Sequence, residues 1–309
     1  MIGAMWGRWV EATSRTEGPE TMALFRIGIG LTLMWTVVTA WTSGAVDLVW
    51  TDAEFGGYRS LHESALVGWL GGASPRVVHG LLGGSLLGGA LVAVGLGGRG
   101  SAFFALQAFI PIARLNSHAN GSFEHLLTNA LWLLVLCRAT GAWSVDQRIA
   151  RRRPPEIGVW ARWLVLAQVI LVYGTTGLQK TSSSWTPLGG FSAIYQALRD
   201  PAWQRVDLPW LGWLAPLLAV STAAVWLFEI GWLLLPLLLW WRATDRGGRL
   251  GAFVRTHDPR PAILAFGLAM HLGILALMQV GGFSVLTLCF YVALWRPDEI
   301  RGWTTGRPR

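Results

Sequence analysis

Residues 169–180 read VILVYGTTGLQK and close an apolar run that begins at residue 158. A helix needs roughly 20 apolar residues to cross a bilayer core, and this run supplies them. It ends on Lys180, the only lysine in a chain with 25 Lys and Arg residues. Arginine keeps its proton near neutral pH, whereas burial lowers the pKa of a lysine. Lys180 is therefore a candidate base, and the alternative is a helix-flanking charge in an arginine-biased sequence.

Similar apolar runs recur along the chain, in which 53% of the residues are hydrophobic and 14% are charged. The predicted spans are 22–42, 77–97, 101–115, 123–140, 158–179, 213–240, 262–278 and 281–296. We expect an all-α polytopic membrane protein with about eight transmembrane helices, forming one transmembrane domain over residues 1–309 with no separate soluble domain. The N-terminus has no cleavage site after its first apolar run, so we expect that span to be retained. Pro236 is expected to tilt or bend the long sixth span.

Arginine positions orient the predicted spans. They are Arg8, Arg15, Arg99, Arg148, Arg151, Arg152, Arg153, Arg242, Arg246, Arg249, Arg255, Arg260, Arg296, Arg301, Arg307 and Arg309. With eight spans all of them fall on one side, which the positive-inside rule assigns to the cytoplasm together with both termini. The net charge of +8 is therefore a topology signal, and we expect contact with membrane lipid and no nucleic-acid partner. The Trp-rich segment 180–212 is predicted to lie on or re-enter the outer face.

Polar side chains at membrane depth are costly and mark functional sites by default. Those in or beside the predicted spans are Asn116, His118, Glu124, His125, Asn129, Lys180, Glu229 and His271. We expect several of them around a cavity that opens to the outer leaflet.

Each of these polar residues also has a structural alternative. A histidine at a helix end often caps the helix, Glu229 can pair with a buried arginine such as Arg26, and Asn129 can hydrogen-bond to another helix. The pair Glu124-His125 lacks the second histidine of an HExxH site, and both cysteines lie in apolar runs. We therefore expect no protein-bound metal and no disulfide.

Five short motifs, in order from about residue 22 to 295, resemble the HTTM family, which includes the vitamin K-dependent gamma-glutamyl carboxylase. They are Ala23-Leu24-Phe25-Arg26, Asn116-Ser117-His118, Trp143-Ser144-Val145-Asp146, Val172-Tyr173 with Gly177, Lys180 and Trp185, and His271 with Gly281, Phe283 and Ser284. No single motif is specific, and their order and spacing across the predicted spans carry the resemblance.

The resemblance implies a membrane-embedded, quinol-dependent oxygenase of the carboxylase type. In the family, the lysine that matches Lys180 deprotonates a reduced naphthoquinone, which reacts with dioxygen. The strong base so formed takes a proton from a peptide glutamate, the carbanion captures carbon dioxide, and the quinone leaves as its epoxide.

The resemblance also implies roles for individual residues. The expected catalytic residues are Lys180, His118 and His271. The expected quinol-binding residues are Asn116, Trp185, Tyr173 and Phe283, and the expected structural polar residues within the membrane are Arg26, Glu229 and Asn129. The implied cofactor is vitamin K hydroquinone or menaquinol, with dioxygen and carbon dioxide as co-substrates. We expect a bacterial-type inner membrane, with the site opening to its outer side.

The chain differs from the carboxylase in features connected with the peptide that is carboxylated. It stops at Arg309 without the large lumenal domain, and Gln179 stands where the carboxylase has a second lysine. We therefore expect the quinol half-reaction to carry over more fully than peptide carboxylation, with a secreted peptide and a small partner protein as possible acceptor and helper.

Two other functions stay open. The first is a non-redox membrane factor for the maturation of, or immunity to, a secreted peptide toxin. The second is a transporter or channel, which the lack of a continuous polar line to the cytoplasm disfavours.

Overall fold

The computed structural model describes residues 2–60, 64–151 and 155–306. Of the arginines used to predict topology, Arg152, Arg153, Arg307 and Arg309, together with the side chain of Arg8, lie outside the described residues. The chain divides into two compact units. Unit 1 comprises Met1–Val165 and Val285–Arg309, and unit 2 comprises Leu166–Ser284.

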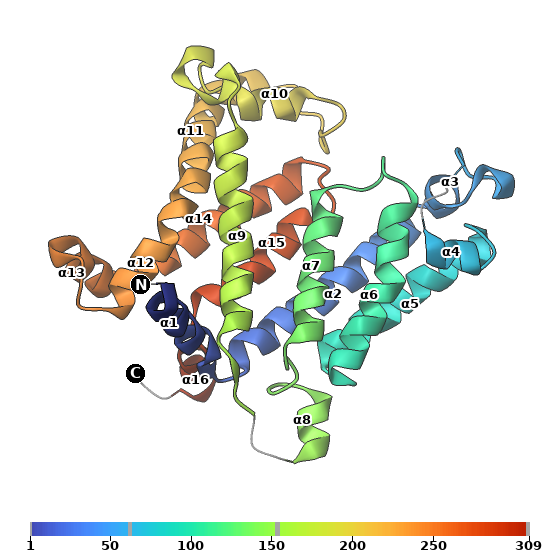
Figure 1. Ribbon diagram of the computed structural model, residues 1–309. Coiled ribbons are helices and arrows are strands. Elements are labelled where there is room, and N and C mark those ends of the chain that lie inside the picture. Colours follow the sequence, from blue (N-terminus) through green and yellow to red (C-terminus); the bar gives the residue numbers. More distant parts are fainter. Residues whose placement is uncertain (1, 61–63, 152–154, 307–309) are drawn as a thin grey trace. The chain divides into compact units, whose positions relative to one another are not determined.

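A helix is present at each of the eight predicted spans (Figure 1). These helices are α2 (Glu20–Thr42), α5 (Pro75–Val94), α6 (Gly98–Leu115), α7 (Ser122–Leu136), α9 (Trp160–Gln179), α11 (Ala215–Gly231) with α12 (Leu235–Ala243), α14 (Arg260–Leu277) and α15 (Phe283–Phe290). Within the described residues, five segments are long and apolar enough to cross a membrane. They are Glu20–Thr42, Pro75–Val94, Trp160–Gln179, Leu211–Ala243 and Arg260–Leu277. The chain is therefore a multi-pass membrane protein, while the count of eight spans stays a prediction.

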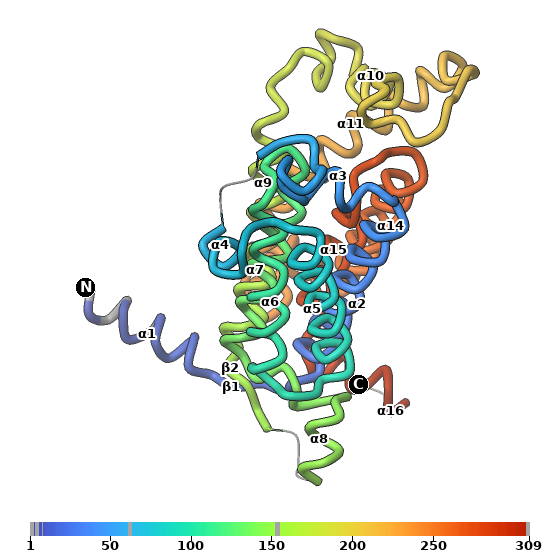
Figure 2. Tube along the Cα trace, turned by 90° about the vertical axis from the view of Figure 1, so that its right-hand side faces the viewer, coloured from blue at the N-terminus to red at the C-terminus, as the bar shows by residue number. Residues whose placement is uncertain are grey.

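Unit 1 is built around α2, α5, α6 and α7, which pack along one another (Figures 1 and 2). Glycines let the backbones approach closely. A Cβ on Gly30 of α2 would lie 2.6 Å from the carbonyl oxygen of Gly89 in α5, and one on Gly88 would lie 2.7 Å from Ala105 in α6. Close packing through small residues is how membrane helices gain van der Waals contact without a hydrophobic drive. The Gly-rich sequence of α5 thus places it between α2 and α6.

Short elements complete unit 1. They are α1 (Ile2–Ser14), α3 (Val46–Trp50), η1 (Ala53–Phe55), α4 (Ala65–Trp69), α8 (Val145–Ala150), η6 (Tyr291–Leu294), α16 (Pro297–Thr305) and the antiparallel pair β1 (Thr16–Glu17) and β2 (Ile157–Gly158).

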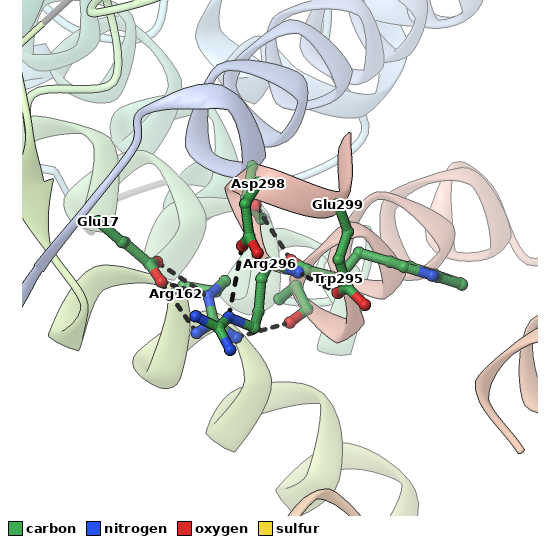
Figure 3. Close-up of polar contacts among 8 residues, drawn as sticks. Glu17, Arg162, Trp295, Arg296, Asp298 and Glu299 are labelled. Carbon is green, nitrogen blue, oxygen red and sulfur yellow. Dashed lines mark hydrogen bonds and ion pairs between the residues drawn. The ribbon is translucent and has the colours of Figure 1, made fainter. Parts of the chain in front are cut away.

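A charged pair ties β1 to the start of α9 (Figure 3). The guanidinium of Arg162, in the first turn of α9, donates three hydrogen bonds of 2.8, 3.1 and 2.9 Å to the carboxylate of Glu17. In the same view Arg296 pairs with Asp298, at the start of α16.

Unit 2 contains the second part of α9, then η2 (Ser183–Trp185), η3 (Pro187–Gly189), α10 (Ala193–Arg199), η4 (Leu211–Leu214), α11, η5 (Trp232–Leu234), α12, α13 (Gly248–Thr256) and α14. Pro236 lies in the first turn of α12, and the chain between α11 and α12 tightens into the 3₁₀ turn η5. Proline lacks the N–H that a continuous helix needs, which explains the break. The sixth span is thus interrupted by a 3₁₀ turn just before Pro236, while its tilt or bend stays a prediction.

The Trp-rich segment of unit 2 folds onto the helices. α10 packs against α11 (Figure 1), and Leu198 of α10 joins Leu211 and Leu218 in a buried cluster. The backbone of Gln279, just after α14, donates a 2.8 Å hydrogen bond to the carbonyl of Trp203. The segment is therefore held by both packing and backbone pairing.

Candidate functional site

Unit 2 contains an apolar cavity of about 560 Å³. Its walls come from α10, α11 and α14 and are formed largely by small and aliphatic side chains, among them Ala193, Ala197, Ala224, Ala269 and Gly273. Because these small residues occur four positions apart on α10 and on α14, each helix presents a shallow face to the cavity. The charged residues that line it are Lys180 and Glu229.

Lys180 and Glu229 form an ion pair in which the amine of Lys180 contacts both carboxylate oxygens of Glu229. The side chains are 16% and 8% exposed, respectively, so the pair is largely shielded from solvent. Lys180 directly follows α9, and Glu229 lies within α11. Glu229 therefore does not pair with Arg26, which the sequence left open as an alternative. The two lie in different units, and Arg26 donates to backbone carbonyls within its own unit.

Gly177 explains why α9 and α11 come close enough for this pair. A Cβ on Gly177 would lie 3.0 Å from the Cβ of Glu229 and 2.9 Å from the backbone nitrogen of Ile230. The carbonyl of Gly177 also accepts a 3.1 Å hydrogen bond from the indole of Trp226. The missing side chain thus sets the crossing point of α9 and α11, one turn before Lys180.

Trp185 completes the surroundings of Lys180. The amine lies 4.1 Å from the centre of the Trp185 ring, within the range of a cation–π interaction. Contacts to two carboxylate oxygens and an aromatic face are those of an ammonium group. Burial lowers the pKa of Lys180, while the charge and hydrogen bonds of Glu229 act in the opposite direction. The site therefore holds an ion-paired lysine whose deprotonation is favoured by burial and opposed by Glu229.

His271 and Tyr173 form a separate buried pair within unit 2. The Tyr173 hydroxyl and the His271 Nε2 are hydrogen-bonded, and both side chains are almost completely buried. The Tyr173 ring stacks on Trp232, and Phe283 lies 6.1 Å from the His271 ring. Neither His271 nor Tyr173 lines the cavity, although Met270 and Gly273 do. The structure thus brings together His271, Tyr173 and Phe283, but it does not group them with Lys180.

Asn116 and His118 lie in unit 1, after α6. The Asn116 amide donates hydrogen bonds of 2.8 Å to the carbonyl of Val49 and 3.1 Å to the Tyr58 hydroxyl. Its side-chain oxygen accepts a 3.0 Å bond from the backbone of His118. The amide is therefore used to hold the segment around α3 in place. The His118 side chain is exposed.

The three residues expected to be structural within the membrane have different surroundings. Arg26 is buried and Glu229 is paired, as described. Asn129 is exposed on α7, and no hydrogen bond links its side chain to another residue in the described parts of the chain. The helix-to-helix hydrogen bond expected for Asn129 is therefore not formed, because the residue points away from the neighbouring helices of unit 1.

Sequence reasoning missed the partner of Lys180. The sequence identified Glu229 as an acid that is costly to bury. It did not identify Lys180 as its partner, because the two residues are 49 positions apart and no local pattern connects them. A signal was present in Gly177, since a glycine three residues before a buried lysine permits a neighbouring helix to bring an acid close.

Comparison with known proteins assigns the chain to a family. Residues 14–298 match the HTTM domain, so the match covers nearly the full chain and extends over both compact units. No curated protein and no solved structure matches the chain. Because the match spans far more than half of the sequence, the chain belongs to the HTTM family.

Proposed function

We propose that unit 2 binds the ring of a reduced naphthoquinone in its apolar cavity and that Lys180 takes a proton from the ring hydroxyl. The observation that carries this proposal is the position of the only lysine in the chain, paired with Glu229 in the wall of a cavity of about 560 Å³. Ligand pockets of small molecules range from about 300 to 1,000 Å³, are mostly apolar and hold a few polar groups. A naphthohydroquinone ring, with one of its two hydroxyls directed at the ion pair and the rest of the ring against the apolar walls, fits that composition.

The Lys180 nitrogen is the proposed acceptor for the proton of the ring hydroxyl. Lys180, whose side chain is 16% exposed, must first release its own proton to water, because an ammonium cannot accept one. The product of that loss is a neutral amine beside a carboxylate, a state that the apolar walls favour for the amine. A phenol-like hydroxyl with a pKa near 10 can then transfer its proton to the Lys180 nitrogen. Glu229 stabilises the ammonium that results.

The surroundings of the pair also limit the access of water. Small and aliphatic side chains from α10, α11 and α14 line the cavity, and the Trp185 ring lies against the amine. When bound, the reduced naphthoquinone supplies the electrons with which dioxygen is reduced, giving an epoxide and water overall. Excluding bulk water from such a site protects a strong base from being quenched.

We further propose that this site faces the outer side of a bacterial-type inner membrane and acts on a secreted peptide. Two observations support the orientation. Lys180 follows the C-terminal end of α9, and Arg162 lies in the first turn at the other end of that helix. The same proposal includes carbon dioxide as a co-substrate and a small protein as a partner.

The test is turnover by the purified full-length protein. Detergent-purified protein is incubated with menaquinol and oxygen, and the quinone products are identified by mass spectrometry. We expect the epoxide from the wild type and none above background from Lys180→Arg, which keeps the positive charge but cannot become neutral. Epoxide from both proteins at equal rates would remove Lys180 from the mechanism, and none from either would leave the chain as a non-redox membrane factor.

A further inference from the structure

Unit 1 contains a second pocket, of about 330 Å³, around which three arginines gather. Arg26 of α2, Arg99 at the start of α6 and Arg138 after α7 all line it, and we call it the arginine pocket. Ser101, Cys137 and Thr140 are among its other lining residues, and the lining includes no carboxylate. The pocket therefore has a concentrated positive charge that its own walls do not neutralise.

Arg26 is the buried member of the three. It is 2% exposed, and its guanidinium donates to five backbone carbonyls, those of Val92, Ala93, Ala139, Ala142 and Trp143. These acceptors are neutral, and in the described parts of the chain Arg26 forms no ion pair. A buried charge without an opposite charge in contact is costly, even when it is hydrogen-bonded.

Asp146 offsets this charge only in part. It lies close enough to act electrostatically on Arg26, but its carboxylate accepts a 2.9 Å hydrogen bond from the backbone of Gly97 instead. Asp146 thus caps the turn before α6. The remaining positive charge of Arg26 is available to an anion in the pocket.

Arg99 and Arg138 differ from Arg26 because they are exposed. Arg99 donates a 2.8 Å hydrogen bond to the carbonyl of Leu136, which holds it at the rim. No hydrogen bond or ion pair of the Arg138 side chain is formed with the described residues. Both guanidinium groups can therefore turn towards a ligand, and α6 begins beside them with the positive end of its dipole.

We propose that the arginine pocket binds a phosphate group, and that the phosphate belongs to an anionic glycerophospholipid of the membrane. Guanidinium groups bind phosphate oxygens in pairs of hydrogen bonds, which makes arginine the preferred residue for this ligand. A lipid is favoured over a soluble phosphate because the pocket lies at the ends of four membrane helices and also carries apolar walls, from Val92, Ala102 and Leu134. Basic pockets between helices on the cytoplasmic side are known to take anionic head groups.

The arginine pocket lies at the ends of α2, α5, α6 and α7 that the arginine pattern of the sequence assigns to the cytoplasm. The pocket involves the second turn of α2, the first turn of α6 and the last turns of α5 and α7. The proposal is independent of the quinol chemistry in unit 2, and its test measures lipid binding rather than turnover.

The experiment is native mass spectrometry of the full-length, delipidated protein titrated with phosphatidylglycerol or with phosphatidylcholine. We expect the wild type to bind phosphatidylglycerol more tightly. The double variant Arg99→Gln, Arg138→Gln is expected to lose about thirtyfold in affinity for it, because each arginine that contacts the head group contributes about fivefold. Arg138→Gln alone tests the same point without disturbing the bond from Arg99 to Leu136.

Matched variants separate the pocket from general charge. Arg148→Gln with Arg249→Gln removes two exposed arginines that do not line the pocket, and it should leave the affinity unchanged. Arg99→Lys with Arg138→Lys keeps the charge and should retain most of the binding. Circular dichroism checks that each variant is folded.

Inorganic phosphate distinguishes the two sources of the ligand. If millimolar phosphate binds and depends on Arg99 and Arg138 while phosphatidylglycerol does not, the pocket binds phosphate but its source is soluble, and the lipid assignment is overturned. If phosphatidylglycerol binds the double variant as tightly as the wild type, or if the Arg148 and Arg249 control loses as much affinity, the proposed site is wrong.

Discussion

The protonation state of Lys180 depends on Glu229 as well as on its own burial. In the structure the amine contacts both carboxylate oxygens and lies 4.1 Å from the centre of the Trp185 ring, so the resting pair holds an ammonium. A base is formed only when that proton leaves. Burial lowers the pKa of Lys180 and Glu229 acts against burial, so the acid sets the pH at which the base becomes available.

Glu229→Gln tests this balance through the pH dependence of epoxide formation. In the proposed mechanism the neutral amine is the active form and predominates above the pKa of Lys180, so we expect the rate to rise with pH through that pKa. Removing the carboxylate removes the effect that raises this pKa, and we expect the rising limb to move to lower pH. Asp207→Asn, which changes an exposed acid of unit 2, is the matched control and should leave the profile in place. An unchanged profile in Glu229→Gln contradicts the proposed role of the pair.

The pair formed by Tyr173 and His271 has a different expected role, because it is buried away from the cavity. Tyr173→Phe leaves the His271 Nε2 without this partner in an apolar interior, and an unsatisfied buried group costs about 1–3 kcal/mol. We expect a lower midpoint of thermal unfolding in detergent, with Tyr195→Phe nearly unchanged because Tyr195 is only half-buried. A fully stable Tyr173→Phe variant with no epoxide formation would instead place the hydroxyl in the reaction.

Sequence reasoning identified individual polar residues better than it paired them. Lys180 stood out because no other lysine exists, and its place beside an apolar cavity agrees with that reading. Lys180 pairs with Glu229 because α9 and α11 pack closely at Gly177. How two helices pack cannot be predicted from a local sequence pattern. His271 was grouped with Lys180 because both are ionisable residues at predicted membrane depth and both match the family motifs, yet the His271 ring pairs with Tyr173 instead.

At the scale of the elements, the crossing of α9 and α11 depends on Gly177. The backbone of Ile230 would lie 2.9 Å from a Cβ at this position, so a side chain must push the helices apart. We expect Gly177→Ala to lower the stability by about 1–3 kcal/mol, as overpacking does, and to weaken the contact between Lys180 and Glu229. Thermal unfolding and the rate of epoxide formation measure the two effects.

Gly231→Ala is the matched control for that substitution. Gly231 also lies in α11, but a Cβ there meets nothing within 4 Å. Replacing a helical glycine with alanine where there is space stabilises a helix by up to about 1 kcal/mol. If both variants behave alike, close approach at Gly177 does not position the pair.

The helices themselves were predictable because apolar runs of sufficient length have few other structures in a membrane. The break at Pro236 was predictable for a local reason, the missing N–H of proline. The short helix α10 was not, because its residues lie in a Trp-rich segment whose fold depends on packing against α11 through Leu198 and Leu218. That segment supplies part of the cavity wall, so the cavity could not be predicted either.

At the scale of the whole molecule, the arginine pattern predicts that both termini face the cytoplasm. A green fluorescent protein fused after residue 309 should fluoresce, and an alkaline phosphatase fused there should be inactive. A phosphatase fused after residue 59, in the predicted outer loop, should be active. An active phosphatase at the C-terminus would show an odd number of spans or the reverse orientation.

A further prediction at this scale concerns what the protein carries when it is isolated. The cavity has apolar walls from three helices and is reached by a lipid-soluble ligand more easily than by a polar one. We expect gently extracted protein to contain a naphthoquinone, detected by mass spectrometry of an organic extract. Phospholipid alone in that extract would count against the assignment of the cavity.

The central claim is that Lys180 gives up its proton more readily than an ordinary lysine, and one measurement tests it directly. Because the chain has a single lysine, protein grown with ¹⁵N-labelled lysine has one side-chain nitrogen signal in an NMR titration. The account predicts a midpoint below the ordinary value of 10.5 in the wild type and a lower midpoint still in Glu229→Gln. A midpoint at or above 10.5 in both proteins would contradict it.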